Sequence, residues 1–155
     1  MTSQPPRDET RAAYRHFVAI PTRWMDNDVY GHVNNVVYYS YFDTAVNRWL
    51  IDRGLLDYLR GETIGLVVHT SCSYFRPLSF PDVIDAGLRV AHLGRSSVRY
   101  DVGLFRQGEP AVAAAGHFTH VYVNRHDNRP SPIAEAMRAA LQTLMTTAGH
   151  DGHQA

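Results

Sequence analysis

Two carboxylates, Asp26 and Asp28, end a β-like run and are the residues of this chain best placed to do chemistry. Gly31 then breaks the run, and Asn34 and Asn35 open a long helical pattern. The first N–H groups of a helix have no partner within it, and the positive end of the helix dipole lies at the same place. Such donors can polarise a carbonyl group beside a carboxylate. The spacing therefore predicts a site at the entrance to the helix.

The segment from Asp26 to Asn35 reads Asp-Asn-Asp-Val-Tyr-Gly-His-Val-Asn-Asn. It resembles the Asp-x-Asp-x-x-Gly-His-Val-Asn-Asn signature of hotdog-fold acyl thioesterases, in the 4-hydroxybenzoyl-CoA thioesterase-like family. It is also similar to the matching segment of plant acyl-ACP thioesterases. The resemblance extends over residues 14–124. It implies a hotdog fold and hydrolysis of an acyl-CoA thioester to free acid and CoA, without a cofactor.

The resemblance gives Asp28 the catalytic role, as nucleophile or as general base for water. A thiolate leaves without being protonated, so one carboxylate and one donor to the oxyanion can suffice. The alternative is a turn or helix-entry aspartate, which is how most Asp residues before a helix are used. Asp26 can face the same side of an extended segment, and we expect it to be structural, with loop N–H groups as its partners.

His32 keeps the position of a histidine that is catalytic in the acyl-ACP enzymes, whereas Tyr30 replaces their catalytic asparagine. A full Asp-Asn-His mechanism is therefore not expected. His32 either orients Asp28 or its water, or hydrogen-bonds the start of the helix. By resemblance, a backbone N–H near Asn35 polarises the thioester carbonyl. The expected oxyanion site at the helix N-terminus comprises Gly31, Asn34 and Asn35. The two asparagine side chains are expected to cap the helix.

Acyl-CoA carries phosphates that need cationic or hydrogen-bonding partners. The sequence Arg95-Ser96-Ser97 follows a turn at Gly94 and resembles the strand start that contacts CoA in the family. Tyr30 is assigned with these residues to substrate binding, and other arginines are further possibilities, namely Arg76, Arg125 and Arg129. Tyrosines near the motif suit an aromatic or a mid-chain acyl group, but core packing explains them equally well. The acyl group is therefore left open.

Hydrophobic periodicity predicts one α+β domain, a sheet wrapped around a central helix. Residues 1–12 are predicted to be a mobile segment, 13–148 the domain and 149–155 a loose tail. Within the domain, short turns favour antiparallel pairing of the strands. The predicted strands are 14–24, 64–76, 84–90, 98–104 and 111–123, and the predicted helices are 35–52 and 133–145. The first helix carries an apolar stripe formed by Tyr38, Phe42, Ala45, Val46, Trp49 and Leu50.

Composition excludes several classes of protein. The 15 basic and 15 acidic residues give a formal net charge of zero, which offers no sign of a nucleic-acid partner or an acidic membrane surface. One cysteine, Cys72, excludes an intramolecular disulfide and fits a reducing compartment. No apolar run is long enough to span a bilayer, and the polar N-terminus is no signal peptide. A cytoplasmic protein without a membrane partner is expected.

Two alternatives are a non-catalytic hotdog module that binds acyl-CoA and an acyl-ACP thioesterase. A pure binder has no need for the carboxylate of Asp28 beside a thioester. The even charge gives little support to docking of an acyl carrier protein. His117 and His120 are an odd number of residues apart on a strand and face opposite sides, so no metal is expected. The family resemblance implies a homodimer that pairs into a tetramer, because one protomer leaves the pocket open at one side.

Overall fold

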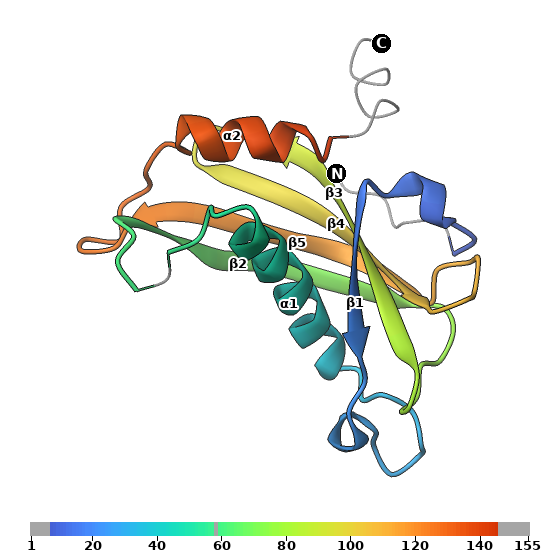
Figure 1. The fold of residues 1–155 in the computed structure, drawn as a ribbon. Coiled ribbons are helices and arrows are strands. Elements are labelled where there is room, and N and C mark those ends of the chain that lie inside the picture. The colour runs from blue at the N-terminus through green and yellow to red at the C-terminus, as the bar shows by residue number, and fades with distance from the viewer. Residues whose placement is uncertain (1–6, 58, 146–155) are drawn as a thin grey trace.

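The computed structural model describes residues 7–57 and 59–145. One antiparallel sheet curves around a long helix, and a second helix covers the end of the sheet drawn at the top of Figure 1. The strand order is β1-β3-β4-β5-β2, which places β1 and β2 at the edges. The strands are β1 (His16–Pro21), β2 (Thr63–Tyr74), β3 (Val83–Leu93), β4 (Ser97–Arg106) and β5 (Ala114–Asn124). The helices are α1 (Val37–Asp52) and α2 (Glu135–Gln142), with single 3-10 turns η1 (Arg11–Ala13) and η2 (Trp24–Asp26). The predicted α+β hotdog architecture is confirmed.

Helix α1 buries the stripe that its sequence predicts. Residues spaced by three and four positions fall on one side of an α-helix, and this side lies against the concave face of the sheet. The buried residues of α1 are Tyr38, Tyr41, Phe42, Ala45, Val46, Trp49 and Leu50. The helix ends where Gly54 adopts a φ of 69°. The N–H of Leu55 then bonds the Leu50 carbonyl at 2.9 Å, and that of Gly54 the Ile51 carbonyl at 3.0 Å. This pair of bonds is a Schellman ending, as the glycine predicts.

Strand β2 departs from the predicted alternation. Its register against β5 shifts between Val67 and His69, so the residues before and after this bulge do not keep one alternating pattern. Cys72 packs against the main core, whereas Leu66, Val67 and Val68 are exposed by 40, 47 and 58%. The hydrophobic residues at the start of β2 therefore lie at an open edge of the sheet instead of covering α1.

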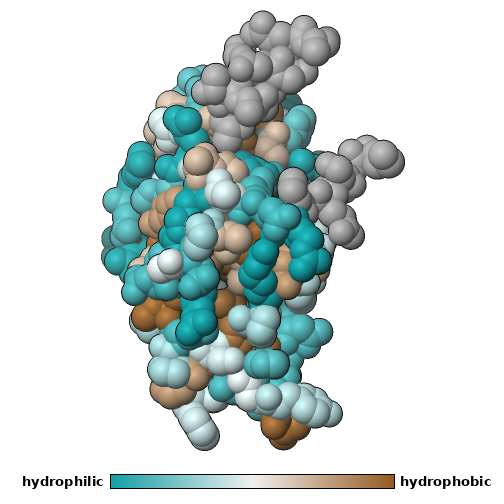
Figure 2. All heavy atoms as spheres, turned by 90° about the vertical axis from the view of Figure 1, so that its right-hand side faces the viewer, coloured by the Kyte–Doolittle hydropathy of each residue, from teal (hydrophilic) through white to brown (hydrophobic). Residues whose placement is uncertain are grey.

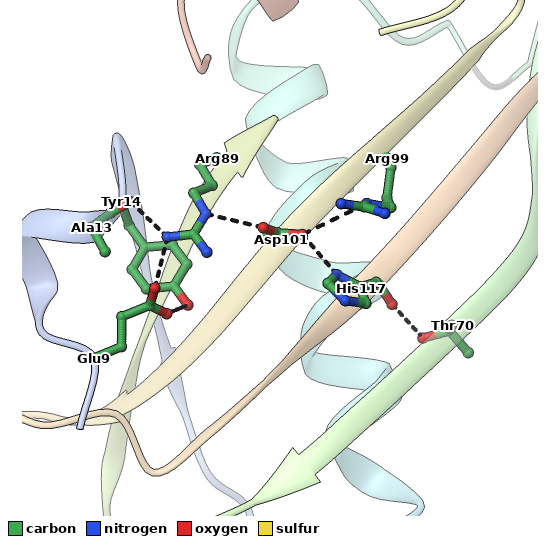
Figure 3. A network of polar contacts seen from close by, with 8 residues as sticks. All are labelled: Glu9, Ala13, Tyr14, Thr70, Arg89, Arg99, Asp101 and His117. Carbon is green, nitrogen blue, oxygen red and sulfur yellow. Dashed lines mark hydrogen bonds and ion pairs between the residues drawn. The ribbon is translucent and has the colours of Figure 1, made fainter. Parts of the chain in front are cut away.

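The segment before β1 lies on the outer face of the sheet. The ring of Tyr14 packs over Gly87 and Gly103, where a Cβ atom at either glycine would overlap it. The Tyr14 hydroxyl donates to Glu9 at 2.6 Å, and Arg89 bridges Glu9 and Asp101 at 3.0 and 3.1 Å (Figure 3). Residues 1–12 were predicted to be a mobile segment from their charge and proline content. The described part of it, residues 7–12, contacts the sheet through Arg11 to Asp85 and Glu9 to Arg89. The proposed tail, residues 149–155, lies outside the described residues, as do residues 1–6.

Two further predictions concern membranes and metals. Within residues 7–57 and 59–145, neither helix is long and apolar enough to cross a bilayer. The same residues contain no group of three or more His, Cys, Asp or Glu side chains that could hold a metal ion.

Candidate active site

The loop between β1 and α1 carries the motif, and the buried side chain of Asp26 holds this loop together through its hydrogen bonds. The Asp26 side chain is 1% exposed and accepts bonds from the Arg23 backbone N–H at 2.9 Å and the Tyr41 hydroxyl at 2.8 Å. The Arg23 guanidinium contacts the same carboxylate at 2.9 Å. Burial would raise the pKa of Asp26, but the bonds from Arg23 and Tyr41 outweigh it and hold the pKa below its ordinary value. This is the structural arrangement expected for Asp26.

Asp28 lies in the next turn and is only partly buried. Its Oδ1 accepts the backbone N–H of Tyr30 at 2.8 Å, and its own N–H donates to the His32 carbonyl at 2.9 Å. The N–H of Gly31 closes a turn onto the Asp28 carbonyl at 3.1 Å, with Gly31 at a φ of 83°. A positive φ of this size is strained for residues with a side chain, so glycine is required here. The turn leaves the second carboxylate oxygen of Asp28 without a bond among the described residues.

The segment that joins β2 to β3 clamps this turn in place. The Val33 N–H donates to the Leu78 carbonyl at 2.7 Å, and the Ser79 hydroxyl donates to the Gly31 carbonyl at 2.8 Å. On the other side, the Phe80 N–H donates to Asn27 Oδ1 at 3.0 Å. These three bonds join residues about fifty positions apart in the chain. Asp28 is thus held by both its own turn and the neighbouring segment.

A groove of about 400 Å³ opens between the motif and the end of β2. Asp28 and Asn35 share it, and the Asn35 N–H has no hydrogen-bond acceptor among the described residues. This N–H lies two residues before the first residue of α1, where helix N–H groups point outward and the dipole is positive. A carbonyl oxygen in the groove could accept this N–H while Asp28 faces the carbonyl carbon. The groove is lined by Asp28, His32, Val33, Asn35, Tyr38, Tyr74, Phe75, Arg76 and Pro77.

The structure brings together some of the predicted site residues and separates others. His32 lines the groove with an exposed side chain for which no bond is found in the described part of the chain. Asn34 accepts the Val36 N–H through its Oδ1 at 3.1 Å, whereas the Asn35 side chain caps nothing, and α1 begins at Val37 instead of residue 35. Tyr30 is 83% exposed and is not among the residues that line the groove.

Arg95, Ser96 and Ser97 lie at the opposite end of the molecule. Arg95 and Ser96 lie in the turn between β3 and β4, and Ser97 is the first residue of β4. This turn lies beside α2, whereas the motif loop lies at the lower end of Figure 1. The Ile133 N–H donates to the Arg95 carbonyl at 2.9 Å, and the Arg138 guanidinium reaches the Gly94 carbonyl at 2.7 Å. None of the three residues lines the groove of its own chain. If they contact substrate, a second chain has to bring them to it.

A family model described as the thioesterase-like superfamily matches residues 22–141 of this chain. That range contains the motif loop, α1, strand β2 and all of α2 except its last residue. The chain belongs to the thioesterase-like superfamily. It is therefore a thioester hydrolase, as the motif predicts, and the alternative of a non-catalytic module is not supported.

Three solved structures are similar to this chain in sequence and fold. The PA5185 protein of Pseudomonas aeruginosa is 54% identical, with 90% of this chain and 98% of that chain covered and a TM-score of 0.88. The PA2801 protein of the same organism is 31% identical, with 83% and 98% covered and a TM-score of 0.77. A Thermus thermophilus thioesterase complexed with coenzyme A and Zn is 33% identical, with 84% and 95% covered and a TM-score of 0.69.

The far wall of the thioesterase groove was not predicted as part of the site. Tyr74 is the last residue of β2, and Phe75 and Arg76 follow it directly, about forty residues after the motif. The Tyr38 and Tyr74 rings meet edge to face with centroids 4.8 Å apart, and the Tyr74 hydroxyl donates to the Asn35 carbonyl at 3.2 Å. The only signal in the sequence was the arginine at position 76, which was named as one possible phosphate contact among several.

Other candidate residues take structural roles. Burial raises the pKa of the Cys72 thiol to about 12, so this residue is a poor nucleophile. Asp43 is exposed, and its carboxylate accepts a bond from Asn47 on its own helix at 2.9 Å. The two histidines of β5 do face opposite sides. His117 bonds Asp101 at 2.7 Å on the outer face, and His120 is buried among aromatic rings on the inner face.

Proposed function

We propose that this protein is an acyl-CoA thioesterase in which Asp28 is the nucleophile or the general base. The observation that carries the proposal is the groove itself. It combines a carboxylate oxygen of Asp28 and the N–H of Asn35 just before α1, and neither has a hydrogen-bond partner among the described residues. A thioester needs both, an attacking oxygen and a donor to its carbonyl oxygen.

The reaction then follows from the chemistry of the thioester. The carbonyl oxygen accepts the Asn35 N–H, which stabilises the negative charge that develops on it. Asp28 either attacks the carbonyl carbon, giving an anhydride that water hydrolyses, or takes a proton from the water that attacks. The C–S bond breaks and the CoA thiolate leaves without needing an acid. His32, whose exposed side chain lines the same groove, is proposed to orient the water.

Coenzyme A is proposed as the carrier on two grounds. The motif resembles that of the CoA family, and the related Thermus thermophilus thioesterase was solved in complex with coenzyme A. Arg95, Ser96 and Ser97 are proposed to contact the CoA phosphates of a site in a partner chain. Nothing in the described residues favours one acyl group over another.

A homodimer is proposed from the exposed surface next to the site. The outer edge of β2 is twelve residues long and unpaired in the described chain, and an edge of this kind readily pairs with another strand. The motif loop also exposes apolar side chains, and hydrophobic atoms reach the surface at the lower end of Figure 2. The most exposed of them are Trp24, Met25, Val29 and Tyr30. By the family resemblance, two such dimers form the tetramer.

The role of Asp28 is tested by Asp28→Asn, which keeps shape and removes charge and nucleophilicity. We expect kcat for a good acyl-CoA substrate to fall by on the order of a hundredfold or more, with little change in KM. Release of free CoA is followed with a thiol reagent over a panel of acyl-CoAs. The matched control is Asp43→Asn, an exposed aspartate on the outer side of α1. A near-normal kcat in Asp28→Asn would show that another residue carries the reaction.

A further inference from the structure

Arg76 is one of the residues that line the groove, and it carries a permanent positive charge. Of the nine residues that line it in the described part of the chain, Arg76 is the only arginine, and none is a lysine. Its side chain is 40% exposed. Arg76 and Asp28 both line this groove of about 400 Å³, and the two side chains form no ion pair with each other. A charged group of the substrate could therefore reach Arg76 while its thioester lies beside Asp28.

Two neutral carbonyls fix the Arg76 guanidinium in position. Its Nη1 donates to the Arg7 carbonyl at 2.7 Å and to the Val112 carbonyl at 2.8 Å. A guanidinium has five N–H donors, and one more is used by the carboxylate of Asp8. The other two N–H groups, one of them on Nε, have no acceptor within residues 7–57 and 59–145. Arg76 is thus oriented in advance, with donors left for a ligand.

The only ionic partner that the described residues give Arg76 is a weak one. Nη2 of Arg76 lies 3.1 Å from Asp8 Oδ1, and the Asp8 side chain is 80% exposed. Ion pairs at this exposure contribute little to stability, because water screens them and both side chains lose freedom. The charge of Arg76 is therefore only loosely compensated, and another anion could replace Asp8 at small cost.

The segment that carries Asp8 is held firmly next to Arg76. The Val112 N–H donates to the Glu9 carbonyl at 3.0 Å, and the Glu9 carboxylate is bonded by Arg89 and Tyr14 (Figure 3). Glu9 itself is thus a fixed anchor, while its neighbour Asp8 extends into solvent. Because Asp8 is attached to this fixed segment, its carboxylate has a high local concentration near Arg76 and competes with any other anion for the guanidinium.

We propose that Arg76 recognises an anionic group of the substrate, and that this group displaces Asp8. The inference rests on the proposed function, because it takes the groove as the place where the thioester binds. The ligand chemistry is an oxyanion that accepts two N–H bonds from the guanidinium. Its source is either a carboxylate on the acyl group or a phosphate of CoA, and the two sources predict different substrate dependence.

Binding of thioether analogues, which cannot be hydrolysed, tests the proposal by calorimetry. Four ligands are compared: a neutral four-carbon acyl-CoA analogue, the same analogue with a terminal carboxylate, and the pantetheine form of each. Arg76→Gln should weaken binding of the recognised anion by about tenfold, and Arg76→Lys should weaken it less. Asp8→Asn should tighten the same binding by about threefold, because the competing carboxylate is gone. The matched control is Arg48→Gln, which removes one member of an exposed ion pair on α1.

The pattern across ligands identifies the source. If the recognised anion is a carboxylate on the acyl group, Arg76→Gln should weaken binding of both ligands that carry this carboxylate, the CoA form and the pantetheine form. If the recognised anion is a phosphate of CoA, Arg76→Gln should weaken binding of both CoA ligands and leave binding of both pantetheine ligands unchanged. An equal loss with all four ligands, or no loss, would overturn the proposal, as would weaker binding in Asp8→Asn. If Arg76→Gln does not fold, Arg76→Lys and Asp8→Asn still decide. These measurements of binding do not depend on turnover. If the analogues bind in an Arg76-dependent way but the protein hydrolyses no acyl-CoA, the proposed function is wrong and the role of Arg76 in binding still stands.

Discussion

At the scale of single residues, the two aspartates of the motif differ in what surrounds them. Asp26 is enclosed and bonded by Arg23 and Tyr41, whereas Asp28 keeps one carboxylate oxygen without a bond among the described residues and lines the groove. Asp26→Asn should lower the free energy of unfolding by about 2 kcal/mol, which is about 4–8 °C in Tm for a chain of this size. The effect on kcat should be much smaller than that of Asp28→Asn. Thermal denaturation and initial rates of both variants check this.

The Asp26 prediction also has a pH dependence. Because the pKa of Asp26 is lowered in the folded state, its contribution is present above the unfolded pKa and is lost as pH falls through the folded value. Tyr41→Phe removes one of the bonds that lower this pKa and should destabilise less than Asp26→Asn. A wild-type Tm in both variants would show that the loop does not depend on this carboxylate.

At the scale of elements, the inner face of β5 buries a histidine without a partner for its Nδ1 in the described chain. Burial lowers the pKa of His120 to about 4. The folded state therefore favours the neutral ring, and stability is lost as pH falls from about 6.5, the unfolded value, towards 4. At pH 5 the loss should be about 2 kcal/mol relative to pH 7. His120→Phe should reduce the Tm difference between these pH values, and His92→Gln, an exposed control, should leave it unchanged.

Features that follow from the spacing of residues along the chain could be predicted from the sequence. Features that depend on how two strands align could not. The stripe of α1 and its ending at Gly54 follow from local spacing and conformation, so the sequence shows them directly. The bulge in β2 depends on its register with β5, which local spacing does not encode. The place of Tyr14 over Gly87 and Gly103 likewise depends on how β3 and β4 align.

The same distinction divides the candidate site. The motif from Asp26 to Asn35 is continuous in the chain, so its turn and its helix entrance could be predicted. Tyr74 and Arg76 reach the site only because β2 ends beside the start of α1. The N-terminal segment was predicted to be mobile from its composition. It is held by the ion pair of Glu9 with Arg89 and by the bond from the Arg76 guanidinium to the Arg7 carbonyl, which composition does not reveal.

At the scale of the whole molecule, the separation of Asp28 from Arg95 leads to a prediction about assembly. The loop between β1 and α1, which carries Asp28, and the turn between β3 and β4, which carries Arg95, lie at opposite ends of one chain (Figure 1), so a site that uses both must combine two chains. The exposed edge of β2 offers the surface for pairing. We expect a homodimer at least, by sedimentation at micromolar concentration. Arg95→Ala should raise KM for acyl-CoA and leave a short thioester without the nucleotide nearly unaffected.

Mixed dimers test the sharing of the site itself. Chains with Asp28→Asn lack the proposed catalytic carboxylate but keep Arg95. Chains with Arg95→Ala keep Asp28 but lack the arginine. Refolded together at equal amounts, they give mixed dimers in half of the population, each with one intact site, so about a quarter of all sites are complete. At low acyl-CoA concentration the mixture should therefore exceed both parent variants in rate. A rate equal to the average of the parents would show that Arg95 does not serve a partner's site, and an active monomer would exclude the shared site altogether.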